Sequence, residues 1–196
     1  MNIKDKSTGS NLTIDERKFL IETARDAIRH AVLGKKYIVP TPVSATLKEK
    51  RGVFVSLHRD GSLRGCIGCI EGFEPLYVSV AELAVAAATE DPRFPAVAPR
   101  ELESIEIEIS VLSPLELIDD ITRIEVGKHG LFIRKQIFSG LLLPQVATKY
   151  GWDRITFLEE TCTKAGLGRN EWKKDADIYI FSAEVFSEKD LAGKSG

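Results

Sequence analysis

Apolar residues recur at three- and four-residue spacing from Ile14 to Leu33, which predicts an amphipathic helix with one core-facing stripe. The stripe contains Leu20, Ala24, Ala27, Ile28 and Ala31. Thr13 and Glu16 have the spacing of a capping box, in which each side chain accepts a hydrogen bond from a backbone N–H at the helix start. Gly34 is suited to end the helix, and His30, beside the stripe, is expected to be structural.

A second helix is expected from Pro75 to about Thr89, because proline suits the first turn of a helix. Its many alanines predict close packing against neighbouring elements. The segment Asp91-Pro92-Arg93-Phe94-Pro95 ends this helix, since Pro92 disfavours helical geometry at Asp91.

Alternation of apolar and polar residues predicts the strands. The segments Gly52–Leu57 and Leu63–Ile70 flank Asp60-Gly61, which is a strong signal for a hairpin. From Ile105 to Val111 the odd positions are apolar and the even positions polar, which predicts a strand with one buried and one solvated face. Residues Ile178–Val185 alternate in the same way and are predicted to form one final strand.

In the second half of the chain, strands are expected near Leu131–Lys135 and Leu141–Leu143, with a short helix after Pro144 and another helix from Thr156 to Ala165. Antiparallel hairpins with helices between them are typical of the α+β class and not of a wound βαβ sheet. The sequence contains no phosphate loop and no dinucleotide fingerprint, so no cofactor is expected.

Length and charge narrow the classes of function. A chain of 196 residues has room for one domain or two intimate subdomains, and 27 basic against 29 acidic residues give a net charge of −2. This balance argues against a nucleic-acid binder, which needs Lys and Arg gathered on one face. The N-terminal residues lack a signal-peptide core and Glu82 interrupts the most apolar stretch, Val78–Ala88, so neither secretion nor a membrane span is expected. Three cysteines are too few for a disulfide framework and predict a cytoplasmic location.

The segment Leu63-Arg64-Gly65-Cys66-Ile67-Gly68, the LRGCIG motif, is the main candidate for chemistry. Glycine inside a strand costs roughly 0.5–1 kcal/mol and marks a bulge or a close approach of another backbone or a ligand. Arg64 and Cys66 are predicted to share one face of the strand, so the guanidinium could bend toward the sulfur and favour its thiolate. In an open pocket Cys66 would be a nucleophile, and in a closed one a small buried apolar residue.

Cys66 and Cys69 also form a C-x-x-C pair. Residues three apart on a strand point to opposite faces, which argues against a dithiol. A structural zinc ion needs four ligands, and only Cys162 and three scattered histidines remain, so no metal site is predicted.

Two loop residues are candidate partners for Cys66. Arg93 stands between two prolines, a rigid setting that suits recognition of a carboxylate or phosphate, although it could instead cap the preceding helix. His129 lies in a turn between glycines and is a candidate acid or base, with no partner identified by the sequence.

Three further polar residues are expected to have no role in chemistry. Glu106 and Glu108 have the composition of a catalytic dyad, but their spacing is better explained by alternation on the solvated face of an antiparallel sheet. His58 is expected to be a solvated residue at the end of a strand.

Several segments occur in a recognisable order: L-R-G-C-I-G at 63–68, D-P-R-F-P at 91–95, E-V-G-K-H-G at 125–130, L-P-Q-V-A at 143–147, and Trp152-Asp153. Together they resemble the AMMECR-type family, the candidate protein family of the AMME syndrome chromosomal region. The resemblance runs from about Thr13 to Val185.

The resemblance implies a single AMMECR-type domain over 12–190, with an α+β fold in two unequal subdomains. These subdomains are built on antiparallel sheets with flanking helices and have a cleft between them. The larger is expected over about 12–113 plus 175–190 and the smaller over about 114–174. Residues 1–11 and 191–196 are rich in Ser, Gly and Lys and are expected to be flexible tails.

The resemblance implies no established reaction. It suggests Memo-like and radical SAM proteins as partners, because members of the family are often encoded beside them in prokaryotes. It also gives the positions of a candidate site: Arg64, Gly65, Cys66, Gly68, Arg93, Phe94, Pro95 and His129. This chain has Cys69 where the family more usually has Thr, which weakens a dithiol mechanism.

Two functional hypotheses follow, and whether the protein is an enzyme stays open. In the favoured one, the motifs bind a small anionic ligand or a partner protein, with Arg64, Gly65, Gly68 and the 93–95 turn as the binding residues. In the alternative, Cys66 is a nucleophile, Arg64 and Arg93 bind an anion, and His129 is the acid or base.

Overall fold

The computed structural model describes residues 11–192, which form two compact units. Within the described residues, unit 1 consists of 11–111 with 184–192, and unit 2 consists of Leu112–Ala183. Each unit has its own sheet and its own buried apolar cluster. The α+β class predicted from the sequence is confirmed, while the cleft implied by the resemblance stays a prediction.

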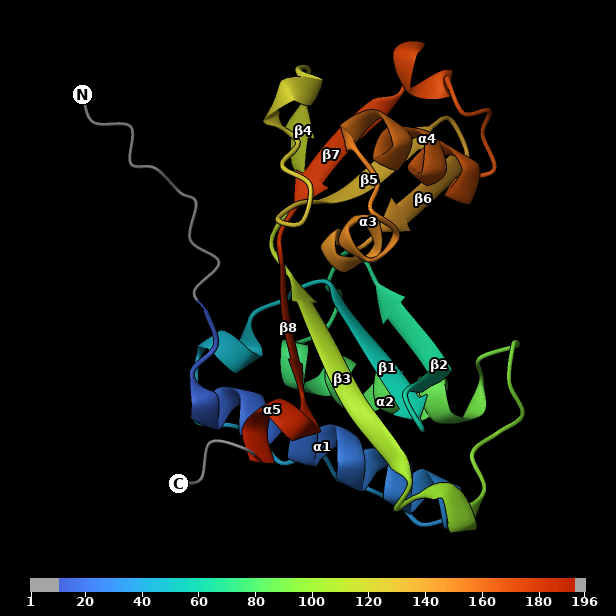
Figure 1. The fold of residues 1–196 in the computed structure, drawn as a ribbon. Coiled ribbons are helices and arrows are strands. Elements are labelled where there is room, and N and C mark those ends of the chain that lie inside the picture. The colour runs from blue at the N-terminus through green and yellow to red at the C-terminus, as the bar shows by residue number, and fades with distance from the viewer. Residues whose placement is uncertain (1–10, 193–196) are drawn as a thin grey trace, which may run out of the picture. The chain divides into compact units, whose positions relative to one another are not determined.

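Unit 1 is built on a four-stranded antiparallel sheet with the order β2-β1-β3-β8 (Figure 1). Its strands are β1 (Val53–Arg59), β2 (Ser62–Cys69), β3 (Ile105–Leu112) and β8 (Ala183–Ser187). The helices α1 (Ile14–Val32) and α2 (Leu76–Thr89) cover one face, and α5 (Glu188–Ala192) follows β8. Two short 3-10 helices, Thr46–Lys48 and Pro99–Glu101, lie in the connections. The strands and helices bury their apolar residues against each other, among them Val55, Leu57, Ile107, Ile109, Leu20, Ile28, Val80 and Ala84.

The helix cap and the hairpin turn that the sequence predicts for unit 1 are both present. Thr13 and Glu16 make both bonds of the capping box at the start of α1. Asp60 and Gly61 have φ values of 51° and 75°, so both adopt the left-handed conformation that a two-residue hairpin turn requires. The hairpin therefore closes directly between Arg59 and Ser62, which are paired in the register of β1 and β2.

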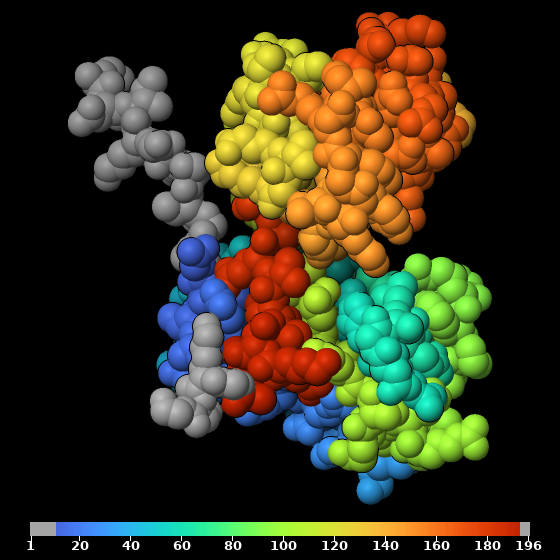
Figure 2. Space-filling view, viewed as in Figure 1, coloured from blue at the N-terminus to red at the C-terminus, as the bar shows by residue number. Residues whose placement is uncertain are grey.

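The C-terminal segment belongs to the core of unit 1. Figure 2 shows the red C-terminal residues beside the blue N-terminal helix. The Arg25 guanidinium on α1 donates to both carboxylate oxygens of Glu188, at 2.9 and 2.5 Å. Leu191 is 8% exposed, so the expectation of a tail from 191 onward is wrong at this residue, because it packs in the core. Of the other expected tail residues, Asn11 is exposed, Ala192 is the exposed last residue of α5, and 1–10 and 193–196 lie outside the described part of the chain.

Unit 2 is built on a second antiparallel sheet, with the order β4-β7-β5-β6. Its strands are β4 (Glu116–Ile118), β5 (Gly130–Lys135), β6 (Phe138–Leu142) and β7 (Asp177–Phe181). Its helices are α3 (Pro144–Tyr150) and α4 (Arg154–Lys164), with 3-10 helices at Ile121–Arg123 and Glu171–Lys173. Its apolar cluster includes Leu131, Ile133, Phe157, Leu158, Ile178 and Ile180.

The predicted single strand Ile178–Val185 is wrong, because the chain changes sheets at Ser182. β7 pairs with β4 and β5 in unit 2, whereas β8 lies beside β3 in unit 1. Asp177–Phe181 therefore belongs to unit 2, although the expected larger subdomain includes 175–190. No glycine or proline stands between Ile178 and Val185, so no turn residue in the sequence marks the break.

None of the helices within residues 11–192 has the combination of length and apolar character that a membrane-spanning helix needs.

Candidate functional site

The LRGCIG motif lies on β2, which is an edge strand of the first sheet. A Cβ on Gly65 would lie 2.2 Å from the carbonyl oxygen of Ala87, so glycine is needed for α2 to approach this closely. A Cβ on Gly68 would lie 2.2 Å from the Phe54 ring, which β1 extends across the glycine. Both glycines thus mark close approaches, as the sequence predicts.

A β-bulge interrupts the regular pairing of β1 and β2 at Arg64. Leu57 pairs with Gly65 and His58 with Leu63, so Arg64 is the extra residue on β2. Its guanidinium is held by Glu101, with Nε donating to Oε1 at 3.0 Å and Nη2 donating to Oε2 at 3.1 Å. The expectation that Arg64 bends toward the Cys66 sulfur is therefore wrong, because a bidentate bond to a carboxylate holds it elsewhere.

Glu101 anchors this part of the site. Besides Arg64, it accepts hydrogen bonds from the backbone N–H of Ala98 at 2.9 Å and from Nη1 of Arg59 at 3.1 Å. The bonds from the Arg64 guanidinium are the main reason that the pKa of Glu101 is lowered to about 2. The carboxylate is therefore ionised at neutral pH and neutralises most of the charge of Arg64.

Asp91 and Arg93 together bind the edge of β2 at Cys66. The buried Asp91 carboxylate, 4% exposed, accepts from the Cys66 N–H at 2.8 Å and from Arg93 Nε and Nη2 at 2.9 and 2.6 Å. Arg93 Nη2 also donates to the Cys66 carbonyl oxygen at 3.3 Å. Both outward backbone groups of Cys66 are thus satisfied by side chains, which protects the strand edge at this residue. The Arg93 guanidinium holds the pKa of Asp91 well below its usual range.

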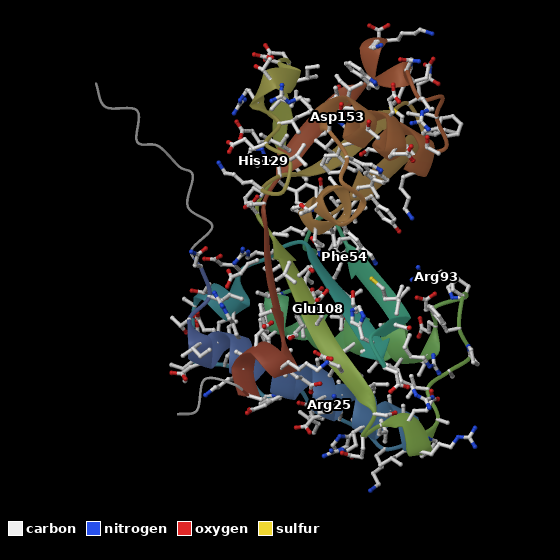
Figure 3. All side chains as sticks on the ribbon, viewed as in Figure 1. Arg25, Phe54, Arg93, Glu108, His129 and Asp153 are labelled. Atoms are coloured by element: carbon white, nitrogen blue, oxygen red, sulfur yellow. The ribbon has the colours of Figure 1, made fainter. Side chains whose placement is uncertain are left out.

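Phe94 lies close to both guanidinium groups of the site. The Arg93 Cζ atom is 5.5 Å from the centre of the Phe94 ring and the Arg64 Cζ atom is 6.0 Å from it. These distances are typical of cation–π contacts. Phe94 is half-buried, whereas Pro95 is exposed. Figure 3 shows Arg93 on the loop beside β2.

Cys66 itself is partly accessible. Its Sγ accepts a hydrogen bond from the Ser56 hydroxyl on β1, with 3.3 Å between oxygen and sulfur. None of the three cysteines, all of which lie within residues 11–192, forms a disulfide. Arg93 is the guanidinium that approaches the cysteine residue, through its backbone carbonyl.

His129 belongs to unit 2, whereas the other seven predicted site residues belong to unit 1. Its Nδ1 accepts a hydrogen bond from the Glu125 N–H at 3.2 Å, which closes the turn that precedes β5. Because Nδ1 accepts, the neutral ring carries its proton on Nε2. His129 is therefore a part of its own turn, and nothing in unit 2 pairs it with a nucleophile among the described residues.

Two carboxylates of the site were not predicted from the sequence. Asp91 stands before a helix-breaking proline, and its position two residues before Arg93 is the signal that could have indicated a local ion pair. Glu101 lies 37 residues from Arg64, and no local pattern predicts that contact. Within residues 11–192, no three His, Cys, Asp or Glu side chains are grouped to hold a metal ion.

Two antiparallel four-stranded sheets with flanking helices, and a polar cluster on one edge strand, define an α+β protein with a candidate binding surface. The AMMECR1 family model matches residues 21–186, and the chain belongs to this family. Protein MK0488 of Methanopyrus kandleri is 45% identical over 195 residues, which cover 94% of this chain and 94% of that protein. Protein MJ0810 of Methanocaldococcus jannaschii is 41% identical over 192 residues, covering 93% of this chain and 95% of that protein.

A solved structure has the same fold. The crystal structure of the uncharacterised protein PH0010 from Pyrococcus horikoshii is similar with a TM-score of 0.82 and 43% sequence identity. The similarity covers 87% of this chain and 90% of that chain.

Proposed function

We propose that the protein is a binding module whose binding surface is the LRGCIG edge of β2 together with the 91–95 loop. The observation that carries the proposal is the state of Arg93: its side chain is 54% exposed, yet two hydrogen bonds from its guanidinium to Asp91 fix it in place. A charged group that is already ordered loses little conformational entropy when it binds. Arg93 is therefore pre-organised for a ligand.

The chemistry of this surface favours a carboxylate or another small anionic group. Asp91 accepts hydrogen bonds from Nε and Nη2 of Arg93. None of the described residues accepts a hydrogen bond from Nη1 of Arg93. Nη1 can thus donate to an incoming anion while the Phe94 ring supplies an apolar contact beside it. One donor and one ring fit an acidic side chain presented by a partner protein, since the rest of the binding energy then comes from the surrounding contact area.

The partners proposed are Memo-like and radical SAM proteins, which the resemblance to the family suggests. The proposed location is the cytoplasm, where cysteines remain reduced, in keeping with the three free thiols of the chain. Neither nucleic acid nor a membrane is a proposed partner.

Pull-down and calorimetric titration test the proposal. The full chain is mixed with the Memo-like protein and with the radical SAM protein of the same organism, each at up to about 50 μM, a range in which weak specific complexes form. We expect a complex with at least one of them, and Arg93→Met is expected to weaken it by about tenfold or more. Arg169→Met is the matched control, because Arg169 is a similarly exposed arginine, 55%, that pairs with Glu159 and Glu160 in unit 2.

Two results would contradict the proposal. One is the absence of a complex with either partner over that concentration range. The other is equal binding by Arg93→Met and Arg169→Met, provided that both variants unfold at the temperature of the wild type.

A further inference from the structure

Three polar side chains form a row across the outer face of the first sheet. Ser56 on β1 is paired with Cys66 on β2 and with Glu108 on β3. Directly opposed residues of antiparallel strands point to the same face, with Cβ atoms about 5 Å apart. The row therefore places a thiol, a hydroxyl and a carboxylate in sequence on the face that α1 and α2 do not cover, where Figure 3 shows Glu108.

The first contact in the row is short. The Ser56 hydroxyl oxygen lies 3.3 Å from Sγ of Cys66, and Ser56 is 8% exposed. The N–H and C=O of Cys66 are directed to Asp91 and Arg93, away from β1. Ser56 and Cys66 are thus a non-hydrogen-bonded pair, the kind whose side chains lie closest together.

The carboxylate at the other end of the row is not hydrogen-bonded to a cationic side chain of the described part of the chain. Its ionic neighbour is Nε2 of His58, 3.9 Å from Oε1 of Glu108, which exceeds hydrogen-bond distance. Glu106, two residues earlier on the same face, is instead paired with Lys189. The Glu108 side chain is one-third exposed, so its carboxylate can be reached by solvent and by a small substrate.

We propose that this row is a catalytic site for acyl transfer, in which Cys66 is the nucleophile and Ser56 and Glu108 remove its proton. The substrate class is an activated acyl compound, such as an ester or a thioester. This activity goes beyond the proposed binding function and does not depend on it: the binding contacts are made by Arg93 and Phe94, whereas the reaction uses the side chains of Cys66, Ser56 and Glu108. Glu108 also replaces His129 as the proposed base.

In the acylation step, the sulfur attacks the carbonyl carbon, the S–C bond forms, and the bond from that carbon to the leaving group breaks. The Ser56 hydroxyl turns its hydrogen to Glu108 and its oxygen accepts the proton of the thiol, since a hydroxyl both donates and accepts. The proton then returns from Glu108 through the Ser56 hydroxyl to the leaving group, because Ser56 lies between Glu108 and Cys66. Water then attacks the thioester carbon, the C–S bond breaks, and a proton returns to the sulfur.

The surroundings of Cys66 suit this role. Asp91 and Arg93 fix the backbone of Cys66 on both sides, which holds the sulfur in one position. Arg93 also keeps a guanidinium beside the cysteine residue, since its Nη2 donates to the Cys66 carbonyl oxygen at 3.3 Å.

Reaction with p-nitrophenyl acetate tests the proposal on the full chain. The measurements are the rate of p-nitrophenolate release and the acetylation of the peptide that carries Cys66, by mass spectrometry. We expect the wild type to acetylate Cys66, Cys66→Ala to lose the reaction, and Cys69→Ala to keep it. Glu108→Gln is expected to lower the rate by about tenfold or more, whereas Glu106→Gln leaves it unchanged.

Ser56 relays the proton between Cys66 and Glu108, and two β-branched variants isolate its hydroxyl. Ser56→Thr keeps the hydroxyl, and Ser56→Val carries a methyl group in its place. We expect Ser56→Thr to retain the acetylation rate and Ser56→Val to lower it by about tenfold. Equal rates for these two variants, equal rates for Glu106→Gln and Glu108→Gln, or an unchanged rate in Cys66→Ala would each overturn the proposal.

The catalytic and binding proposals can fail independently of each other. Ser56→Val and Glu108→Gln are also titrated with the Memo-like and radical SAM proteins, and both are expected to bind as the wild type does. Acetylation without any complex would support the acyl-transfer site and contradict the binding module. A complex formed by a chain that does not acetylate Cys66 would support the binding module and contradict the acyl-transfer site.

Discussion

Gly65→Ala is expected to destabilise unit 1 strongly, because the added Cβ has no space. It would lie 2.2 Å from the Ala87 carbonyl oxygen and 3.2 Å from the carbonyl carbon, whereas ordinary contact begins near 3.4 Å. The obstacle is backbone, so α2 and β2 must separate by about 1 Å and disturb the packing on both sides. Overpacking of this kind costs about 3 kcal/mol.

The assay must distinguish the two units. The two tryptophans, Trp152 and Trp172, both lie in unit 2, so their fluorescence follows the unfolding of that unit. Hydrogen exchange of the β2 amides, read by mass spectrometry, follows unit 1. We expect Gly65→Ala to speed exchange in β2 and to lower the midpoint of its thermal unfolding by about 10 °C.

Gly168→Ala in unit 2 is the control. A Cβ there would meet its nearest neighbour, Cγ of Glu171, at 3.6 Å, which is ordinary contact. Its midpoint should stay within about 1 °C of the wild type, since a surface substitution without a clash changes little. An unchanged midpoint for Gly65→Ala, or a shift confined to the tryptophan signal, would refute the steric explanation.

Three further predictions concern single side chains. The lowered pKa of Glu101, about 2 against the usual 4.5, means that its ion pair stabilises the fold above pH 4.5 and that this stability is lost as the pH falls toward 2. Glu101→Gln should therefore cost about 3 kcal/mol in urea unfolding at pH 7 and progressively less below pH 4.5. Thr13→Ala removes the capping box of α1 and should cost about 1 kcal/mol, seen as faster hydrogen exchange in the first turn of the helix. Asp153→Ala removes the N-cap bond to Thr156 in α4 and should lower the stability read by tryptophan fluorescence by about 1 kcal/mol, with no change in exchange at β2.

The parts of the fold that the sequence predicts depend on neighbouring residues. The Asp60-Gly61 turn needs only two residues able to adopt positive φ, and both do. The capping box depends on Thr13 and Glu16, one helical turn apart. The close approach at Gly65 follows from the presence of glycine in a strand, although the identity of its neighbour, Ala87, does not.

The residues of the site were predictable only in part, because their partners are distant in sequence. Strand alternation places Arg64 beside Cys66, but the bulge and the Glu101 carboxylate set its direction, and neither has a local signature. The partners of Ser56 likewise become visible only in the register of three strands. Composition could not reveal this row, since serine and glutamate are common on solvated sheet faces.

The change of sheet at Ser182 was not predicted from the sequence for a different reason. Ile178 to Phe181 are consecutive apolar residues, and apolar and polar residues alternate only from Phe181 to Val185, so neither segment contains a turn signal that would separate two strands. The choice of sheet is made by distant partners: β7 pairs with β4 and β5, while β8 lies beside β3.

Unit 2 is an insertion within unit 1, and this order has a consequence for folding during synthesis. Ser113 and Ser182, near its two ends, are joined by two hydrogen bonds of 2.9 Å, so the insertion leaves and returns at one place. A nascent chain that has reached Ala183 holds all of unit 2 but lacks β8 and α5. Until Glu188 emerges from the ribosome, the Ile107 N–H and the Arg25 guanidinium have no acceptor there, and the edge of β3 stays open to other strands. The last strand and helix therefore close unit 1 after unit 2 has been synthesised, and we expect a chain truncated after residue 183 to leave unit 1 open to aggregation while unit 2 is complete.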